Sequence, residues 1–123
     1  MRRALMTALI AMLLSVPAAL ADDDARATAT CGRGARAELR IRADHGSIRV
    51  EFTLRHRRSG EPWRLVLVHE RRVAWRKTVR TRGSSGSLRV RRMVRDFDGP
   101  DQVTTRASGP HGLTCVATAT LPG

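Results

Sequence analysis

Apolar and polar residues alternate along most of this chain, and a period of two is typical of β-strands that bury one face. The clearest runs cover residues 35–42 and 48–55. Their apolar members, expected on the buried face, are Ala35, Ala37, Leu39, Ile41, Ile48, Val50, Phe52 and Leu54. His45 and Gly46 lie between the two runs and form a predicted turn. The pattern therefore predicts two strands separated by a turn in the first half of the chain.

Two further strands are predicted in the middle of the chain. Residues 63–68 are apolar on both faces after Arg64, which predicts a central strand covered on both sides. In residues 72–80 the positions of apolar parity include Val73, Trp75 and Val79. Lys77 shares that parity, so we expect it near a sheet end with its ammonium group turned outward.

Three more strands complete the pattern. The fifth begins at Leu88, and the Arg91-Arg92 doublet then interrupts its alternation, which a β-bulge would reconcile. Residues 103–107 and 114–121 follow, each after a loop rich in Gly and Pro. Seven short strands with turn signals between them, and no helical period outside the N-terminal segment, predict an all-β fold. We expect a two-sheet antiparallel sandwich of immunoglobulin type over residues 28–123.

The first 21 residues have the three parts of a secretory signal peptide. A positive start precedes residues 4–14, which are uncharged and mostly apolar, and Ala19 and Ala21 are the small residues of a cleavage site after Ala21. A membrane anchor is the alternative, but the apolar stretch is shorter than the roughly 20 residues that span a bilayer. The sequence therefore predicts no transmembrane anchor and a secreted protein, extracellular or associated with the cell wall, in which residues 22–27 form a disordered N-terminal segment.

The two cysteines, Cys31 and Cys115, lie near the two ends of the predicted mature chain. Disulfides persist in the compartment to which export would deliver them, so a single bridge is expected. Two free buried thiols are the alternative, and a redox or metal role is weaker because no Cys-x-x-Cys spacing is present. The first and last strands meet at the edge of such sandwiches, where a Cys31–Cys115 bond would join them.

Several turn and core signals carry a family resemblance. They are Trp63 before an apolar run, the segment 98–104 (DGPDQVT) before the sixth predicted strand, and the segment 112–117 (GLTCVA) near the end. With these features the chain resembles small exported immunoglobulin-like or fibronectin-III-like domains of GC-rich bacteria over about residues 28–121. It is also similar in size to secreted carriers of the antibiotic chromoprotein kind, which usually have a second disulfide. The absence of Tyr excludes the tyrosine corner of antibody domains. The resemblance implies a fold and no particular activity.

The chain is strongly basic, with 23 Lys+Arg against 11 Asp+Glu and a formal net charge of +12. A GC-rich genome would by itself favour arginine, but many arginines also share the outward parity of their strands. These are Arg36, Arg40, Arg42, Arg49, Arg55, Arg72, Arg76, Arg80, Arg89 and Arg91. We expect the strands at 35–42, 48–55 and 88–95 in one sheet, with residues 72–80 joining its edge. Its outer surface would then be an array of guanidinium groups relieved only by Glu38 and Glu51, which favours binding of a polyanion.

Residue patterns for catalysis and for metal binding are weak. His69-Glu70 lacks the second His of a zinc-protease helix. Of the other histidines, His45, His56 and His111, the first and last lie in predicted turns beside Gly, where a polar residue is ordinary. Ser84, Ser85 and Ser87 lie in a loop without a nucleophile-elbow motif. The segment 96–101 (DFDGPD) is similar to a calcium loop, but Gly99 comes too early for that register. We therefore expect no enzyme activity, no cofactor and no metal.

These observations favour a secreted, non-enzymatic binding module that is associated with the cell envelope. The expected partners are anionic envelope polymers or lipid head groups, because nucleic-acid binders of single strands need exposed aromatic side chains and both Trp are expected in the core. Three alternatives stay open. The first is a protein-binding module, such as a secreted inhibitor or assembly partner, that uses a loop end or sheet edge, and the second is a small-molecule carrier. The third is a hydrolase, whose turnover would depend on His69 or His111.

Overall fold

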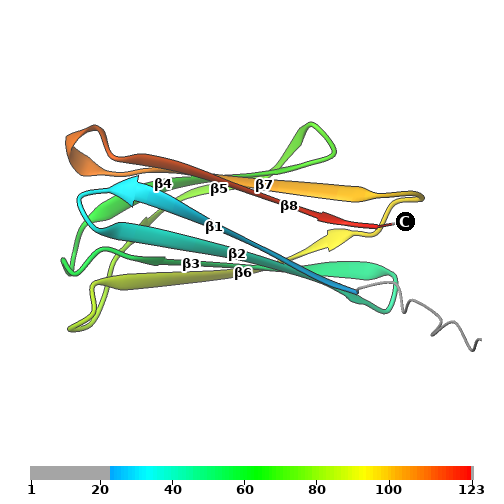
Figure 1. The fold of residues 1–123 in the computed structure, drawn as a ribbon, viewed down its shortest axis with the longest axis horizontal. Coiled ribbons are helices and arrows are strands. Elements are labelled where there is room, and N and C mark those ends of the chain that lie inside the picture. The colour runs from blue at the N-terminus through cyan, green and yellow to red at the C-terminus, as the bar shows by residue number, and fades with distance from the viewer. Residues whose placement is uncertain (1–22, 123) are drawn as a thin grey trace, which may run out of the picture.

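The computed structural model describes residues 23–122 and shows two antiparallel four-stranded sheets packed face to face (Figure 1). Sheet A has the order β1 (Asp24–Gly32), β2 (Ala35–Asp44), β3 (Ser47–Arg55) and β6 (Ser87–Arg95). Sheet B has the order β5 (Arg72–Arg80), β4 (Pro62–His69), β7 (Asp101–Ser108) and β8 (Thr114–Leu121). A single 3₁₀ turn, Pro110–Gly112, joins β7 to β8. The predicted all-β sandwich is confirmed, with eight strands among the described residues instead of seven.

The additional strand is β1, which starts at Asp24, so most of the predicted disordered segment 22–27 is paired with β2. The predicted signal peptide, with Ala19 and Ala21, lies outside the described residues. No helix between residues 23 and 122 is long and apolar enough to cross a membrane. Membership of a particular immunoglobulin-like family stays a prediction.

Short hairpins determine which strands are neighbours. Two-residue links join β1 to β2, β2 to β3 and β4 to β5, and both residues of each link have positive φ. Such turns match the right-handed twist of paired strands. The link between β4 and β5 is Glu70-Arg71, with φ of 50° and 66°. It holds β5 beside β4 in sheet B, so the prediction that residues 72–80 join the sheet of β2, β3 and β6 is wrong.

The facing surfaces of the two sheets form the core. The apolar residues predicted on one face of β2 and β3 are all buried. Trp63 at the start of β4 is fully buried, and the loop before β8 crosses directly over its ring. Gly109 is required in this loop, because a Cβ there would lie 2.6 Å from Cε2 of Trp63.

Three predicted details of the strand alternation differ from the structure. β4 is central as predicted, but Val66 and Val68 on its outer side are only half-buried. The bulge predicted at Arg91-Arg92 is absent from the continuous β3–β6 register. The irregularity lies between β4 and β5, at Leu67 and Val68, and it turns Val73 to the outer side of sheet B.

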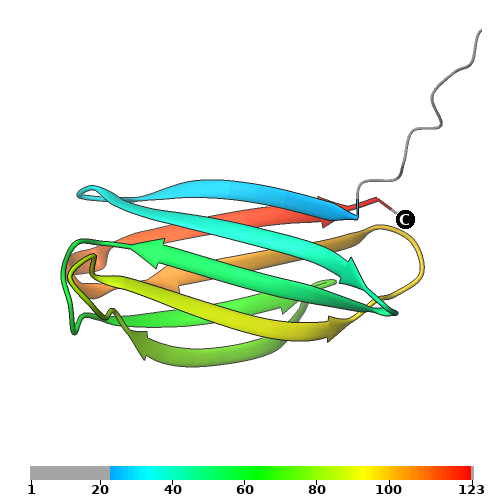
Figure 2. The same ribbon diagram turned by 90° about the horizontal axis from the view of Figure 1, so that it is seen from below.

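The two long sides of the sandwich differ. On one side β1 and β8 lie close together (Figure 2), where their inward residues are mostly alanine and the sheets can approach. On the other side the edge strands β5 and β6 have few contacts with each other. There Arg92 occupies an inward position on β6 and places its guanidinium carbon 4.6 Å from the ring centroid of Trp75, a cation–π contact. Lys77 on β5 is exposed on this open side.

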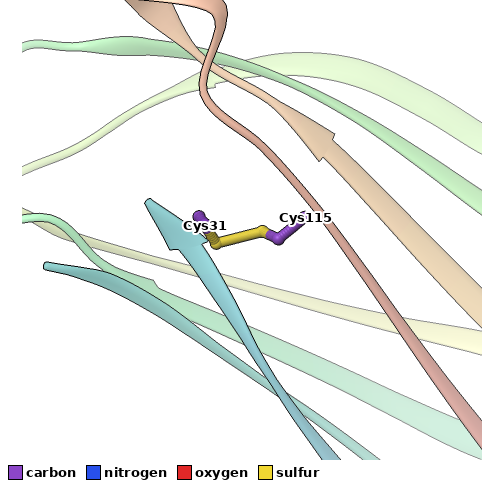
Figure 3. Close-up of a disulfide and its surroundings, with 2 residues drawn as sticks. All are labelled: Cys31 and Cys115. Carbon is purple, nitrogen blue, oxygen red and sulfur yellow. A yellow bond between two sulfur atoms is a disulfide. The ribbon is translucent and has the colours of Figure 1, made fainter. Parts of the chain in front are cut away.

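A disulfide closes the β1–β8 side (Figure 3). Cys31 on β1 and Cys115 on β8 are bonded, their Cα atoms are 4.5 Å apart, and both residues are buried. The predicted bridge is therefore confirmed, and it joins the edge of sheet A to the edge of sheet B. No free cysteine is present in the described part of the chain.

Candidate anion-binding face

The outer surface of sheet A carries a group of nine arginines, which we call the arginine face. Each occupies an outward position, next in the strand to residues that point into the core. The nine are Arg26, Arg36, Arg40, Arg42, Arg49, Arg55, Arg89, Arg91 and Arg95. Seven of the ten arginines predicted for this surface are thus brought together. Arg26 was missed because its segment was predicted to be disordered, although the alternation of small and polar residues from Ala25 to Cys31 is a strand signal.

Four acidic residues share this face, twice the number that the sequence predicted. Besides Glu38 and Glu51, Asp24 lies 2.8 Å from Arg40 and Asp44 lies 3.0 Å from Arg49. The hydrogen bond from Arg40 lowers the pKa of Asp24, and the same bond raises the pKa of Arg40. These pairs are partly exposed, so each contributes little to stability.

Glu51 is shared between two arginines of β6. Its carboxylate oxygens lie 3.3 Å from Arg89 and 3.4 Å from Arg91. With nine arginines against four carboxylates, the arginine face keeps an excess of positive charge although part of it is paired.

The excess is greatest where Arg36 and Arg55 oppose each other. They are direct cross-strand partners on β2 and β3, and like charges in that position repel. Among residues 23–122, no carboxylate lies within 4.0 Å of either guanidinium. This pair is therefore the part of the face with the most to gain from an external anion.

An open hollow of about 430 Å³ lies beside this pair. Arg36, Arg40, Arg55 and Arg89 line it together with Glu38, Glu51 and two threonines, Thr28 and Thr53. A guanidinium donates two parallel hydrogen bonds to a carboxylate, phosphate or sulfate, and the threonine hydroxyls can donate further ones. The hollow can therefore hold an anionic group that contacts several arginines at once.

The three remaining predicted arginines belong to sheet B and do not reach the arginine face. Arg72 is next to the hairpin, opposite His69, and Arg80 donates a hydrogen bond to the carbonyl oxygen of Gly60 at 2.9 Å. Arg76 is on the outer side of sheet B. The hairpin at Glu70-Arg71 accounts for this correction, because it places the whole of β5 beside β4.

A second group of chemically capable side chains lies where β4 ends and β7 begins. His69 Nε2 and Asp101 Oδ1 are 2.8 Å apart, and both residues are buried. The Phe97 amide donates a hydrogen bond to the same oxygen of Asp101, and the Phe97 ring stacks on His69. Sequence reasoning missed this pairing, because the two residues are 32 positions apart and no local motif joins them.

Glu70 extends this group toward solvent. One potential ligand atom from each of His69, Glu70 and Asp101 lies within 4.8 Å of the others, so these are the described residues that could hold a metal ion. In the structure they satisfy other partners: the His and Asp bond to each other, and Glu70 accepts a hydrogen bond from the Gln102 amide at 2.7 Å.

The β6–β7 loop adds acidic side chains next to Asp101. A hydrogen bond to Asp101 raises the pKa of Asp96 above its ordinary value of 3.8, and desolvation and the charges of Asp101 and Asp98 act in the same direction. Asp23, Asp96, Asp98 and Asp101 line an open hollow of about 340 Å³ at this end of the sandwich. This end of the sandwich therefore carries a cluster of acidic side chains, although the protein as a whole is basic.

The raised pKa of Asp96 makes stability depend on pH in a definite direction. An acid whose pKa is raised by folding stabilises the folded state below its unfolded value, and this contribution is lost as the pH rises through the folded value. We therefore expect Asp96→Asn to have a higher thermal midpoint than the wild type at pH 7. The advantage should vanish at pH 3, where Asp96 is protonated in both states. Thermal unfolding of both proteins at the two pH values checks this prediction. The same difference in thermal midpoint at pH 3 and pH 7 would contradict it.

Comparison of the chain with protein-family models, with curated proteins and with solved structures found no significant match. Function therefore has to be inferred from the side chains and their arrangement in this fold.

Proposed function

We propose that this protein is an exported, non-enzymatic binding module whose arginine face docks onto polyanions of the cell envelope. The observation that carries the proposal is the unrelieved Arg36–Arg55 pair at the rim of a hollow lined by two more arginines. Juxtaposed guanidinium groups repel one another, and an anion that contacts several of them removes this cost. The sandwich fixes the backbone positions of the arginines, so the conformational entropy lost on binding is confined to their side chains.

Polymers that carry carboxylate, phosphate or sulfate groups fit this face better than single-stranded nucleic acid does. Stacking of bases needs exposed aromatic side chains. Trp63 is buried in the core, and Trp75 is half-buried under Arg92. Insertion into a lipid bilayer would need apolar side chains on the face, and among the described residues Met93 is its one exposed large apolar side chain. Envelope polymers are therefore the favoured partners.

Export is part of the proposal. The predicted signal peptide supports it, as does the Cys31–Cys115 disulfide, since such bonds persist in oxidising compartments outside the cytosol. A location at the wall or in the medium would bring the arginine face into contact with anionic envelope polymers.

Charge reversal on one face tests the proposal directly. We expect Arg36→Glu/Arg55→Glu/Arg89→Glu to abolish retention on a sulfated-glycan resin and on isolated envelopes at low salt. Where residual binding can be measured, the slope of log K against log salt should fall by about three, roughly one for each lost ionic contact. Isothermal titration at several salt concentrations gives this slope.

The matched control is Arg64→Glu/Arg76→Glu/Arg106→Glu, which makes the same change of charge on sheet B. It should keep most of the affinity of the wild type for the sulfated glycan. Equal loss in both triple variants would mean that net charge and not the arginine face drives binding. Retention of the wild-type protein on the resin that does not weaken as salt rises would also overturn the proposal.

A further inference from the structure

The outer surface of sheet B differs in chemistry from the arginine face, and we call it the valine face. Val66 on β4 is at its centre. Its cross-strand partners are Arg76 on β5 and Arg106 on β7, and Arg64 is the next outward residue along β4. Val68 is the next outward residue in the other direction. An apolar side chain is thus surrounded by three arginines at strand spacing, about 4.8 Å across the sheet and about 7 Å along it.

No acidic residue occupies an outward position of β4, β5, β7 or β8. Within the described part of the chain, Arg64, Arg76 and Arg106 have no carboxylate within 4.0 Å. The arginine face, by contrast, pairs four of its nine arginines with its own acids. The charge of the valine face is fully available to a partner.

The apolar part of this face extends on both sides of its centre. Val73 on β5 is paired with Val68, and Val116 on β8 is paired with Arg106. Val73 and Val116 are each 48% exposed. Between the valines lie threonines, two of which, Thr104 and Thr118, share a hydrogen bond of 2.9 Å. Protein–protein interfaces are enriched in Arg, are depleted in Lys, Glu and Asp, and have a more apolar core than rim. The valine face shares the Arg content, the absence of acids and the apolar centre.

We infer that the valine face docks a protein partner that presents carboxylates around an apolar side chain. A polyanionic polymer would use the arginines and leave the valines without a role. A bilayer is disfavoured because the short valine side chains do not project beyond the longer arginines around them. An amphipathic helix fits the dimensions: a Leu over Val66 would place glutamates one turn away, about 5–6 Å, within reach of Arg76, Arg106 and Arg64.

The probe is a synthetic helical peptide with a central Leu flanked by Glu at i−4, i−3, i+3 and i+4. A second peptide of the same length and charge has Gln in place of Leu. Both are titrated into the ¹⁵N-labelled wild-type protein and followed by NMR. We expect shifts to concentrate on β4, β5 and β7, and the Leu peptide to bind about tenfold more tightly than the Gln peptide, because it buries one Leu side chain.

Three variants test the assignment. Arg64→Glu/Arg76→Glu/Arg106→Glu should lose the Leu peptide, and the nearly isosteric Val66→Thr should remove the preference for Leu over Gln. The arginine-face triple Arg36→Glu/Arg55→Glu/Arg89→Glu should bind the Leu peptide like the wild type. This last result separates the two proposals, because that variant loses the glycan and keeps the peptide.

Shifts that map to β2, β3 and β6 would overturn the inference, as would equal affinity for the two peptides or no binding of either. The mapping on the wild-type protein keeps the test decisive even where a variant folds poorly. Binding of the sulfated glycan can succeed or fail independently of all these outcomes.

Discussion

Replacement of both cysteines, Cys31→Ser/Cys115→Ser, should lower the free energy of unfolding by about 2–5 kcal/mol. The bridge encloses a chain separation of 84 residues, and chain entropy alone assigns about 4–5 kcal/mol to the closure of such a loop in the unfolded state. A domain of this size is stable by only about 5–15 kcal/mol in total. The loss would therefore be a large fraction of the stability of the protein.

Removal of the disulfide should destabilise the β1–β8 side of the sandwich most. β1 and β8 are edge strands of different sheets, and their inward residues are small, so they bury little apolar area to compensate for the lost bond. We expect the amides of β1 to exchange with solvent much faster in the double variant, while those of β3, a central strand, change only as much as global stability does.

Urea unfolding of the wild-type protein and the double variant measures the loss of free energy. Reduction of the wild-type protein with dithiothreitol gives a second route to the same state, and its midpoint should approach that of the double variant. Dithiothreitol should leave the double variant unchanged, which controls for effects of the reagent. Coinciding midpoints for oxidised wild-type and variant proteins would show that the bridge does not stabilise the fold.

β2, β3 and the disulfide could be predicted from the sequence because their signals are strong. Both strands alternate apolar residues, several of them large, with mostly charged ones, and two cysteines allow one intramolecular pairing. β1 was partly missed because its inward residues are alanines, whose burial depends on the close approach of β8 from the other end of the chain. Local hydrophobicity contains no signal for such a long-range contact.

β5 lies in sheet B because of the two-residue turn Glu70-Arg71, which contains no glycine. Glu70 and Arg71 adopt positive φ without the Asn-Gly or Asp-Gly signature that predicts a tight hairpin. The outward parity of the arginines was therefore predictable, and their division between two sheets was not. The Arg91-Arg92 doublet interrupts the alternation and so predicts a bulge. In the structure the strand is regular, and the open side between β5 and β6 lets the inward guanidinium of Arg92 lie over Trp75.

Substitution of either partner in the buried His69–Asp101 pair should destabilise the protein by about 1–3 kcal/mol, because it leaves a buried polar group without its hydrogen-bond partner. Asp101 is 2% exposed and His69 is 5% exposed, so neither side chain can recover its lost hydrogen bond from bulk water. In His69→Ala the side chain of Asp101 still accepts a hydrogen bond from the Phe97 amide but loses its contact with His69 Nε2. The Phe97 ring also loses the imidazole on which it stacks. In Asp101→Ala the buried imidazole is left without an acceptor.

The more informative variant is Asp101→Asn. The amide oxygen can still accept a hydrogen bond from His69 Nε2 and from the Phe97 amide, and the amide nitrogen can donate to Asp96. We expect it to retain most of the stability that Asp101→Ala loses, because the hydrogen bonds survive and the repulsion with Asp96 is removed. Thermal and urea unfolding of His69→Ala, Asp101→Ala, the double alanine variant and Asp101→Asn measure these differences.

The double-alanine cycle isolates the interaction between the two side chains. If the pair acts as a unit, the double variant should be little worse than either single one, since most of the cost arises from the unpaired buried partner. Additive losses would show instead that His69 and Asp101 act separately, His69 by packing against Phe97 and Asp101 by holding the β6–β7 loop. In that case adding Asp101→Asn to His69→Ala should cost no further stability, because the asparagine then has to supply only the loop contact through the Phe97 amide.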